Sequence, residues 1–261
     1  MSEYVLITGA STGIGYELAH LFAQEKRNLI LVARGKEKLE EVSKELKDKY
    51  GTTIYIFPLD LSQASAPLKL YEFTESNKLF VETLVNNAGF GIKGHVSKIP
   101  LNEELEMIQV NISSLVELTK RYLPAMLSNK KGKILNVAST ASFQAGPYMS
   151  GYYASKAFVL HYTEGLAEEL IGTGVTATTL CPGPTITSFQ LRAKMEETAL
   201  FKSPLVMTGK EVAKIGFNAM KNGRVVIIAG IMNFLLVEGT RFSPRFLVRK
   251  ISAFLNGGGK D

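Results

Sequence analysis

Residues 8–15 read Thr8-Gly9-Ala10-Ser11-Thr12-Gly13-Ile14-Gly15. The stretch follows a short apolar run, Tyr4–Thr8, and precedes a segment with helical periodicity. Glycines at this spacing let the backbone turn tightly and approach a pyrophosphate, whose charge is favoured by the unpaired N–H groups at a helix N-terminus. Three glycines after a strand also fit an ordinary tight turn, so the loop alone does not decide between the two.

Outward from this loop, short apolar runs alternate with longer segments of helical periodicity. This alternation predicts a parallel sheet buried on both faces and covered by helices on each side. We therefore expect an α/β fold, a single doubly wound Rossmann-type domain with about seven parallel strands. The expected strands are Tyr4–Thr8, Asn28–Ala33, Thr53–Pro58, Thr83–Asn86, Gly132–Ala138, Gly174–Leu180 and Arg224–Ala229. The expected helices are Ile14–Glu25, Lys36–Tyr50, Ala64–Asn77, Asn102–Leu127, Tyr152–Ile171 and Gly209–Asn222.

The composition is that of a globular chain. Of 261 residues, 46% are hydrophobic and 21% charged, which fits one domain over residues 1–261 and excludes disordered or collagen-like classes. Cys181 is the single cysteine, so an intrachain disulfide and a cysteine-based metal cluster are excluded, and the three histidines are too scattered to suggest a metal site. We expect a soluble, cytoplasmic protein, because no secretory signal or apolar run of transmembrane length is present.

The formal net charge of +6 reflects basic residues that are mostly spread along the chain. A short run such as Lys130–Lys133 is typical of a solvated turn, so we do not expect nucleic acid as a partner.

The glycine loop resembles that of the short-chain dehydrogenase/reductase family, and further family motifs follow in the family's order. Asn86-Asn87-Ala88-Gly89 comes after the fourth expected strand and Tyr152-Tyr153-Ala154-Ser155-Lys156 opens a helix. The resemblance implies an oxidoreductase that binds NAD(P) and forms a homodimer or homotetramer. It also implies cofactor contacts from Gly9, Ser11, Gly13, Ile14, Gly15, Asp60, Leu61, Asn87, Ala88, Gly89, Tyr152, Lys156, Pro182, Gly183, Ile186 and Thr187. In the family, the counterparts of Asp60 and Leu61 touch the adenine and those of residues 182–187 lie against the nicotinamide.

The end of the second expected strand predicts which nicotinamide cofactor is preferred. In dinucleotide folds an acidic residue about 20 positions after the glycine loop binds the ribose hydroxyls and selects NAD. Here Ala33 takes that position and Arg34 follows. A guanidinium can bind a 2′-phosphate with charge-assisted hydrogen bonds, so we expect NADP, with NAD possible. Thr12 departs from the NADP-dependent relatives, which often carry a second basic residue there.

Tyr152 and Lys156 are predicted to lie on one side of a helix, because four positions make about one turn. A free tyrosine has a pKa near 10, and a neighbouring ammonium would bring that pKa toward neutrality. Tyr153 lacks this register with Lys156. The resemblance adds Ser139, whose hydroxyl would bind the substrate oxygen, and Asn111, which would hold a water linking Lys156 to solvent.

These residues predict an NADP-dependent oxidoreductase that transfers hydride between the nicotinamide and a carbonyl or secondary alcohol, with Tyr152 as the general acid/base. A catalytically silent NADP-sensing protein of the same fold remains an alternative, although loss of Tyr152 or Lys156 would have favoured it and both are present. No metal is required by this chemistry.

In this fold, substrate choice is expected to lie with residues 139–151 and 188–204, of which 188–204 are predicted to form a lid over a partly apolar pocket. Residues 231–256 are predicted to form a C-terminal appendage with an amphipathic, basic helix. That helix could pack on the core, cover the pocket or pair with another subunit, and we favour such a protein contact. Peripheral attachment to an anionic membrane surface is the alternative.

Overall fold

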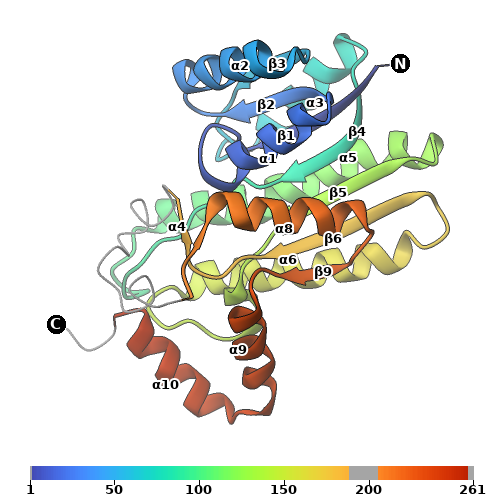
Figure 1. Cartoon of the computed structure of the whole chain (residues 1–261). Coiled ribbons are helices and arrows are strands. Elements are labelled where there is room, and N and C mark those ends of the chain that lie inside the picture. The colour runs from blue at the N-terminus through green and yellow to red at the C-terminus, as the bar shows by residue number, and fades with distance from the viewer. Residues whose placement is uncertain (1, 188–204, 258–261) are drawn as a thin grey trace.

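Seven parallel strands form the central sheet of the computed structural model, which describes residues 2–187 and 205–257 (Figure 1). The strand order is β3-β2-β1-β4-β5-β6-β9, as in a doubly wound dinucleotide fold. The strands are β1 (Glu3–Thr8), β2 (Asn28–Ala33), β3 (Ile54–Pro58), β4 (Phe80–Asn86), β5 (Gly132–Val137), β6 (Val175–Cys181) and β9 (Val226–Ile228). The predicted fold class and all seven sheet strands are confirmed, with ends that differ by up to three residues.

Helices cover both faces of this sheet because successive residues of each strand point to opposite sides. The helices are α1 (Gly13–Gln24), α2 (Lys36–Tyr50), α3 (Ala66–Ser76), α4 (Leu101–Ile108), α5 (Ser114–Ser128), α6 (Ser150–Glu169), α8 (Gly209–Lys221), α9 (Ile231–Phe242) and α10 (Arg245–Leu255). In β1, Tyr4 and Leu6 join one core with residues of α3, α4, α5 and α6, whereas Val5 and Ile7 join a second core with α1, α2 and α8.

The long predicted helix over residues 102–127 is in fact interrupted. A π-helical segment, Gln109–Ser113, joins α4 to α5 and contains the buried Asn111. The extra residue per turn of a π-bulge changes the helix register locally, and such bulges are frequent at functional sites.

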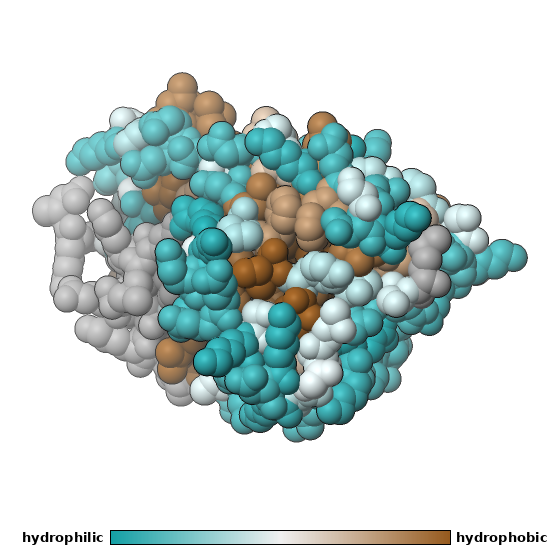
Figure 2. Space-filling model, turned by 90° about the horizontal axis from the view of Figure 1, so that it is seen from above, coloured by the Kyte–Doolittle hydropathy of each residue, from teal (hydrophilic) through white to brown (hydrophobic). Residues whose placement is uncertain are grey.

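The C-terminal appendage is two helices and not the single one expected. Ser243 adopts an extended conformation and Pro244 stands at the N-cap of α10, because the residue before a proline is disfavoured in the helical region. The two helices project below the sheet, at the end of the molecule opposite to α2 and β3 (Figure 1). The face over α2 and β3 is largely hydrophilic around its rim, and apolar residues show mainly in a hollow near its middle (Figure 2).

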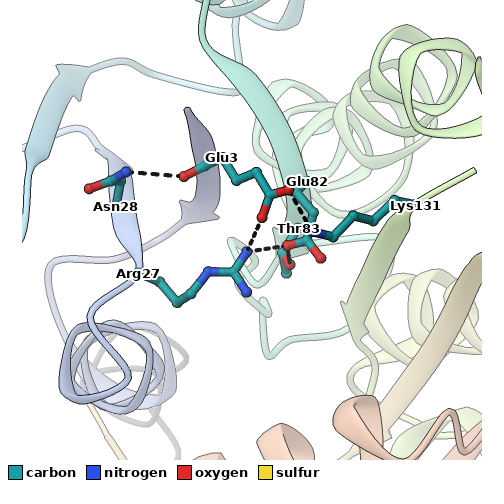
Figure 3. Close-up of polar contacts among 6 residues, drawn as sticks. All are labelled: Glu3, Arg27, Asn28, Glu82, Thr83 and Lys131. Atoms are coloured by element: carbon teal, nitrogen blue, oxygen red, sulfur yellow. Dashed lines mark hydrogen bonds and ion pairs between the residues drawn. The ribbon is translucent and has the colours of Figure 1, made fainter. Parts of the chain in front are cut away.

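A charged cluster ties together the N-terminal ends of the sheet strands (Figure 3). Glu82 in β4 is only 3% exposed. Its carboxylate accepts hydrogen bonds from Arg27, at 2.5 Å, and from the hydroxyl of Thr83, at 2.6 Å. Glu3, at the start of β1, joins through Lys131 at 2.5 Å and through Arg27 at 3.8 Å.

We expect Glu82→Gln to lower the free energy of unfolding by about 2 kcal/mol, because it removes the charge that compensates Arg27 and breaks a buried ion pair. Arg27 is partly exposed and can be hydrated, which keeps the loss below that of a fully buried pair. Glu3→Gln is the matched control, since its pairs are exposed and should be worth about 0.5 kcal/mol or less. Urea denaturation measures both. Equal losses of unfolding free energy in Glu82→Gln and Glu3→Gln would contradict the view that the buried Glu82–Arg27 pair is the stabilising part of the cluster.

Candidate functional site

A cavity of about 630 Å³ opens at the carboxyl ends of the parallel strands, where ligands bind in doubly wound sheets. Most predicted cofactor-binding residues line it: Gly9, Ser11, Gly13, Ile14, Arg34, Asp60, Leu61, Asn87, Ala88, Gly89, Tyr152, Lys156, Pro182, Gly183 and Thr187. One continuous hollow therefore joins the glycine loop to the Tyr152–Lys156 pair.

The glycine loop wraps the start of α1 as the sequence predicts. Gly9 has a φ of +66°, which favours glycine. Gly15 does not line the cavity but packs beneath it, where a Cβ atom would lie 2.3 Å from the Gly9 carbonyl oxygen. The first turn of α1 carries no acidic side chain, so its N–H groups and helix dipole are available to an anion such as a pyrophosphate.

Thr8 and Asn87 fix the loop against the end of β4. The Thr8 hydroxyl donates to the carbonyl oxygen of Val85 at 3.2 Å and accepts from the backbone N–H groups of Asn87 and Ala88, both at 3.0 Å. In return the Asn87 amide donates to the carbonyl oxygens of Thr8, at 2.8 Å, and Gly9, at 3.2 Å. These five bonds hold both nucleotide-facing loops in one arrangement before any ligand arrives.

Arg34 lies at the rim of the cavity directly after β2. Its side chain is exposed, and within residues 2–187 and 205–257 no acid forms an ion pair with it. Ala33 lines the cavity beside it. A guanidinium in this position, with no carboxylate at residue 33, suits a phosphate group on the ribose.

Ser139, Tyr152 and Lys156 meet at the inner end of the cavity. Ser139 caps a short 3-10 helix (Thr140–Phe143) after β5, accepts from the Ala141 N–H at 3.1 Å and is hydrogen-bonded to the Tyr152 side chain. Lys156 donates from Nζ to the carbonyl oxygen of Val137 at 2.8 Å, and Nζ lies 5.9 Å from the centroid of the Tyr152 ring. Tyr152 and Lys156 share a face of α6, as their spacing predicts.

The pKa values at this end of the cavity are set mainly by burial. Removal from water raises the pKa of Tyr152, while the hydrogen bond from Ser139 acts in the opposite direction. Burial lowers the pKa of Lys156 to about 8. The expected lowering of the Tyr152 pKa toward neutrality is therefore wrong for the protein alone, because desolvation of the phenolate is the largest effect on this pKa. Tyr152 is protonated at neutral pH, and so is Lys156 below pH 8.

Asn111 lies behind the cavity and does not line it. Its Oδ1 accepts from the Phe90 N–H at 3.1 Å, and its Nδ2 donates to the Phe90 carbonyl oxygen and to the hydroxyl of Ser155, both at 3.0 Å. A Cβ atom on Gly89 would lie 3.1 Å from Asn111 Oδ1 and 3.2 Å from Lys156 Nζ. Asn111 thus anchors the loop after β4 to α6, and its predicted hold on a water molecule stays a prediction.

Ile186 differs from most of the predicted cofactor contacts, and its role in cofactor binding stays a prediction. Its side chain is 59% exposed and does not line the cavity. It lies in β7 (Thr185–Ile186), which pairs with β8 (Met207–Thr208) in a small second sheet that the sequence did not reveal. Thr187, next along the chain, does line the cavity and packs against Gly13. The predicted lid, 188–204, lies outside the described residues.

Sequence reasoning missed two residues on the cavity wall beside Tyr152. Tyr153 and Leu255 line it together with Met149 of the predicted substrate segment 139–151, and Leu255 belongs to α10. The next residue, Asn256, is fully buried, accepts from the Tyr153 hydroxyl at 3.2 Å and donates to the Pro147 carbonyl oxygen at 3.0 Å. Through Leu255 and Asn256, the end of the appendage covers one side of the pocket, which is one of the contacts expected for it. The amphipathic pattern indicated a packed face but not its partner.

The short chain dehydrogenase family model matches residues 3–198 of the chain. The chain belongs to the short-chain dehydrogenase/reductase family. This family membership makes it an oxidoreductase by class, as the sequence resemblance implied.

Similar proteins of this family include reductases and dehydrogenases. A ketoacyl reductase, HetN, of Nostoc sp. is 31% identical over 86% of this short-chain dehydrogenase/reductase and 77% of its own length. An NADP-dependent 3-hydroxy acid dehydrogenase of Schizosaccharomyces pombe is 30% identical over 90% and 93% of the two chains. A solved short-chain dehydrogenase from Sphingobium yanoikuyae in complex with NADPH is 28% identical, covers 92% and 94% of the chains and superposes with a TM-score of 0.82.

Proposed function

We propose that this protein is an NADPH-dependent reductase of an apolar carbonyl compound, with the corresponding secondary alcohol as product. The observation that carries the proposal is the cluster of Ser139, Tyr152 and Lys156 inside the same cavity as the glycine loop and Arg34. A bound nicotinamide supplies or accepts hydride in this chemistry. Two relatives, the ketoacyl reductase and the NADP-dependent 3-hydroxy acid dehydrogenase, have names consistent with it.

Tyr152 is the proposed proton donor to the carbonyl oxygen. Its raised pKa keeps the hydroxyl protonated at neutral pH, which is the form that reduction consumes. In the protein alone the Ser139 hydroxyl is hydrogen-bonded to Tyr152 and lies 3.3 Å from the Pro182 carbonyl oxygen, and with substrate bound its one proton would turn to the substrate oxygen. Because both groups aim at one oxygen, they fix the carbonyl and stabilise the negative charge that develops on it.

Lys156 is proposed to bind the nicotinamide ribose and to favour the phenolate left after proton transfer. One N–H of its ammonium is used on the Val137 carbonyl oxygen, and a lysine has further donors for ribose hydroxyls. With a pKa of about 8, Lys156 is charged through the neutral range and loses its charge as the pH rises above that value. Proton transfer from Tyr152 therefore happens next to a cation at neutral pH.

The wall beyond these groups favours an apolar substrate. Phe90, Val110, Met149, Tyr153 and Leu255 line the cavity near Tyr152, and apolar walls with a few convergent polar groups are typical of small-molecule sites. The substrate class proposed is therefore a ketone or aldehyde with a hydrophobic body.

The test is NADPH oxidation with a panel of 3-oxoacyl thioesters, ketosteroids, diketones, aromatic aldehydes and sugars, with NADH in parallel. We expect turnover of at least one apolar carbonyl compound and none of the sugars. NADPH binding is followed by its own fluorescence, which is convenient because the chain has no tryptophan. Tight NADPH binding with no turnover of any compound would favour a nucleotide-sensing protein and contradict the proposal.

A further inference from the structure

The two C-terminal helices present apolar side chains to solvent. On α9, the exposed apolar residues include Ile231, Leu235 and Phe242, the last of them 88% exposed. On α10 they are Phe246, Leu247, Ile251 and Phe254, the last 69% exposed. Apolar residues scattered singly need no explanation, whereas a group of this size on adjoining helices marks an interaction surface.

The inward faces of both helices are already filled. In α10 Ser252 is buried against the domain, whereas Leu247, Ile251 and Phe254, spaced by four and three residues, share a different and exposed face. In α9, Asn233 and Val237 are buried and Asn233 donates to the Ala229 carbonyl oxygen at 2.8 Å. The predicted packing on the core therefore holds for the inward faces only, and the outward apolar residues contact no core.

The C-terminal end of α10 is anchored to the domain. Asn256, directly after α10, is buried and bonded to both Tyr153 and Pro147. These two bonds fix the orientation of α10 relative to the domain.

The same two helices also carry most of the charge of this region as cations. Residues 231–257 contain four basic residues, Arg241, Arg245, Arg249 and Lys250, and one acid, Glu238. Glu238 pairs with Arg241 at 3.1 Å, and α10 itself contains no acidic residue. A partner for this surface has to provide both an apolar phase and negative charge.

An anionic lipid bilayer meets both requirements. Amphipathic helices bury their apolar side in the acyl boundary of a membrane while basic residues pair with anionic headgroups. A second copy would instead bring the same basic surface, with Glu238 as the single acid of residues 231–257, against these cations, and like charges repel. None of the described helices is both long and apolar enough to span a bilayer, so attachment would be at the surface. We propose that α9 and α10 dock this protein on the surface of an anionic membrane.

The test is co-sedimentation of the full chain with vesicles of phosphatidylcholine, with and without phosphatidylglycerol. The wild type is expected to bind the anionic vesicles at least about tenfold more strongly than the neutral ones, and added salt should weaken this binding. Arg249→Glu with Lys250→Glu should lower the partition coefficient by about thirtyfold or more. The matched control, Lys44→Glu with Lys47→Glu, makes the same charge change on the exposed side of α2, at the opposite end of the molecule.

The apolar part is tested separately by Phe254→Ser, with Ile171→Ser as control because Ile171 is similarly exposed, at 72%, in the turn after α6. Only Phe254→Ser should weaken vesicle binding, and unchanged circular dichroism would show that both variants fold. No wild-type binding to anionic vesicles, or equal losses in the α10 and α2 variants, would overturn the proposal. The proposal would also be overturned if the wild type were a dimer in sedimentation equilibrium, bound no vesicles, and became a monomer on Phe254→Ser.

Discussion

Tyr152→Phe is expected to lower kcat for carbonyl reduction by about 1000-fold, because it removes the proposed proton donor. Its hydroxyl is hydrogen-bonded to Ser139 at the inner end of the cavity, and burial keeps it protonated. NADPH affinity should change little, because the phosphate-facing loop and Arg34 are untouched. Steady-state kinetics with the best substrate of the panel, together with NADPH fluorescence titration, separates the two effects.

The adjacent tyrosine provides the matched control. Tyr153 has the same side chain and also lines the cavity, but its hydroxyl bonds Asn256 and lies outside the catalytic cluster. Tyr153→Phe loses one neutral hydrogen bond and should retain kcat within about tenfold. A Tyr152→Phe enzyme that keeps most of its activity, or a Tyr153→Phe enzyme that loses as much, would refute the assignment of the proton donor.

Arg34→Ala should raise the dissociation constant for NADPH by about 100-fold and leave that for NADH within about threefold. The reason is that a charge-assisted hydrogen bond to a phosphate contributes roughly 1.5–3 kcal/mol, and only NADPH carries the 2′-phosphate. Arg34 lines the cavity, exposed and with no ion pair to any acid that the structure describes. Isothermal titration with both cofactors gives the two constants directly.

Lys36→Ala is the control for Arg34, because Lys36 is also exposed and basic but does not line the cavity. It should leave both affinities close to those of the wild type. If the wild type prefers NADH, or if Arg34→Ala weakens both cofactors equally, Arg34 does not select the cofactor.

Local pattern was sufficient to predict most of the fold. The expected β2 and α2 have the observed bounds. Glycines flank α2 on both sides, Gly35 before it and Gly51, with a φ of +66°, as its C-cap, and these local signals mark both ends. The start of β4 was missed because Glu82 interrupts its apolar run. The charge that compensates this buried carboxylate comes from Arg27, which is distant in sequence. The helix break at Pro244 carried a local signal that the amphipathic pattern on both sides obscured.

The candidate site divides in the same way. Residues within motifs at strand ends, such as Asn87 and Ser139, could be predicted because parallel strands bring their carboxyl ends to one edge of the sheet. The Tyr153–Asn256 hydrogen bond joins positions 103 residues apart, and no short-range sequence pattern predicts such a contact. The direction of the Tyr152 pKa shift was also beyond the sequence, because desolvation depends on the packed surroundings.

The bond between Asn256 and Tyr153 has a consequence for the order in which the protein matures on the ribosome. The nucleotide-facing loops are fixed by contacts among residues of the first third of the chain, such as Thr8 and Asn87. Leu255, on the cavity wall, is translated after every strand of the sheet. Since a domain generally folds as a unit, the chamber for substrate can close only after α10 has been translated and Asn256 has reached Tyr153.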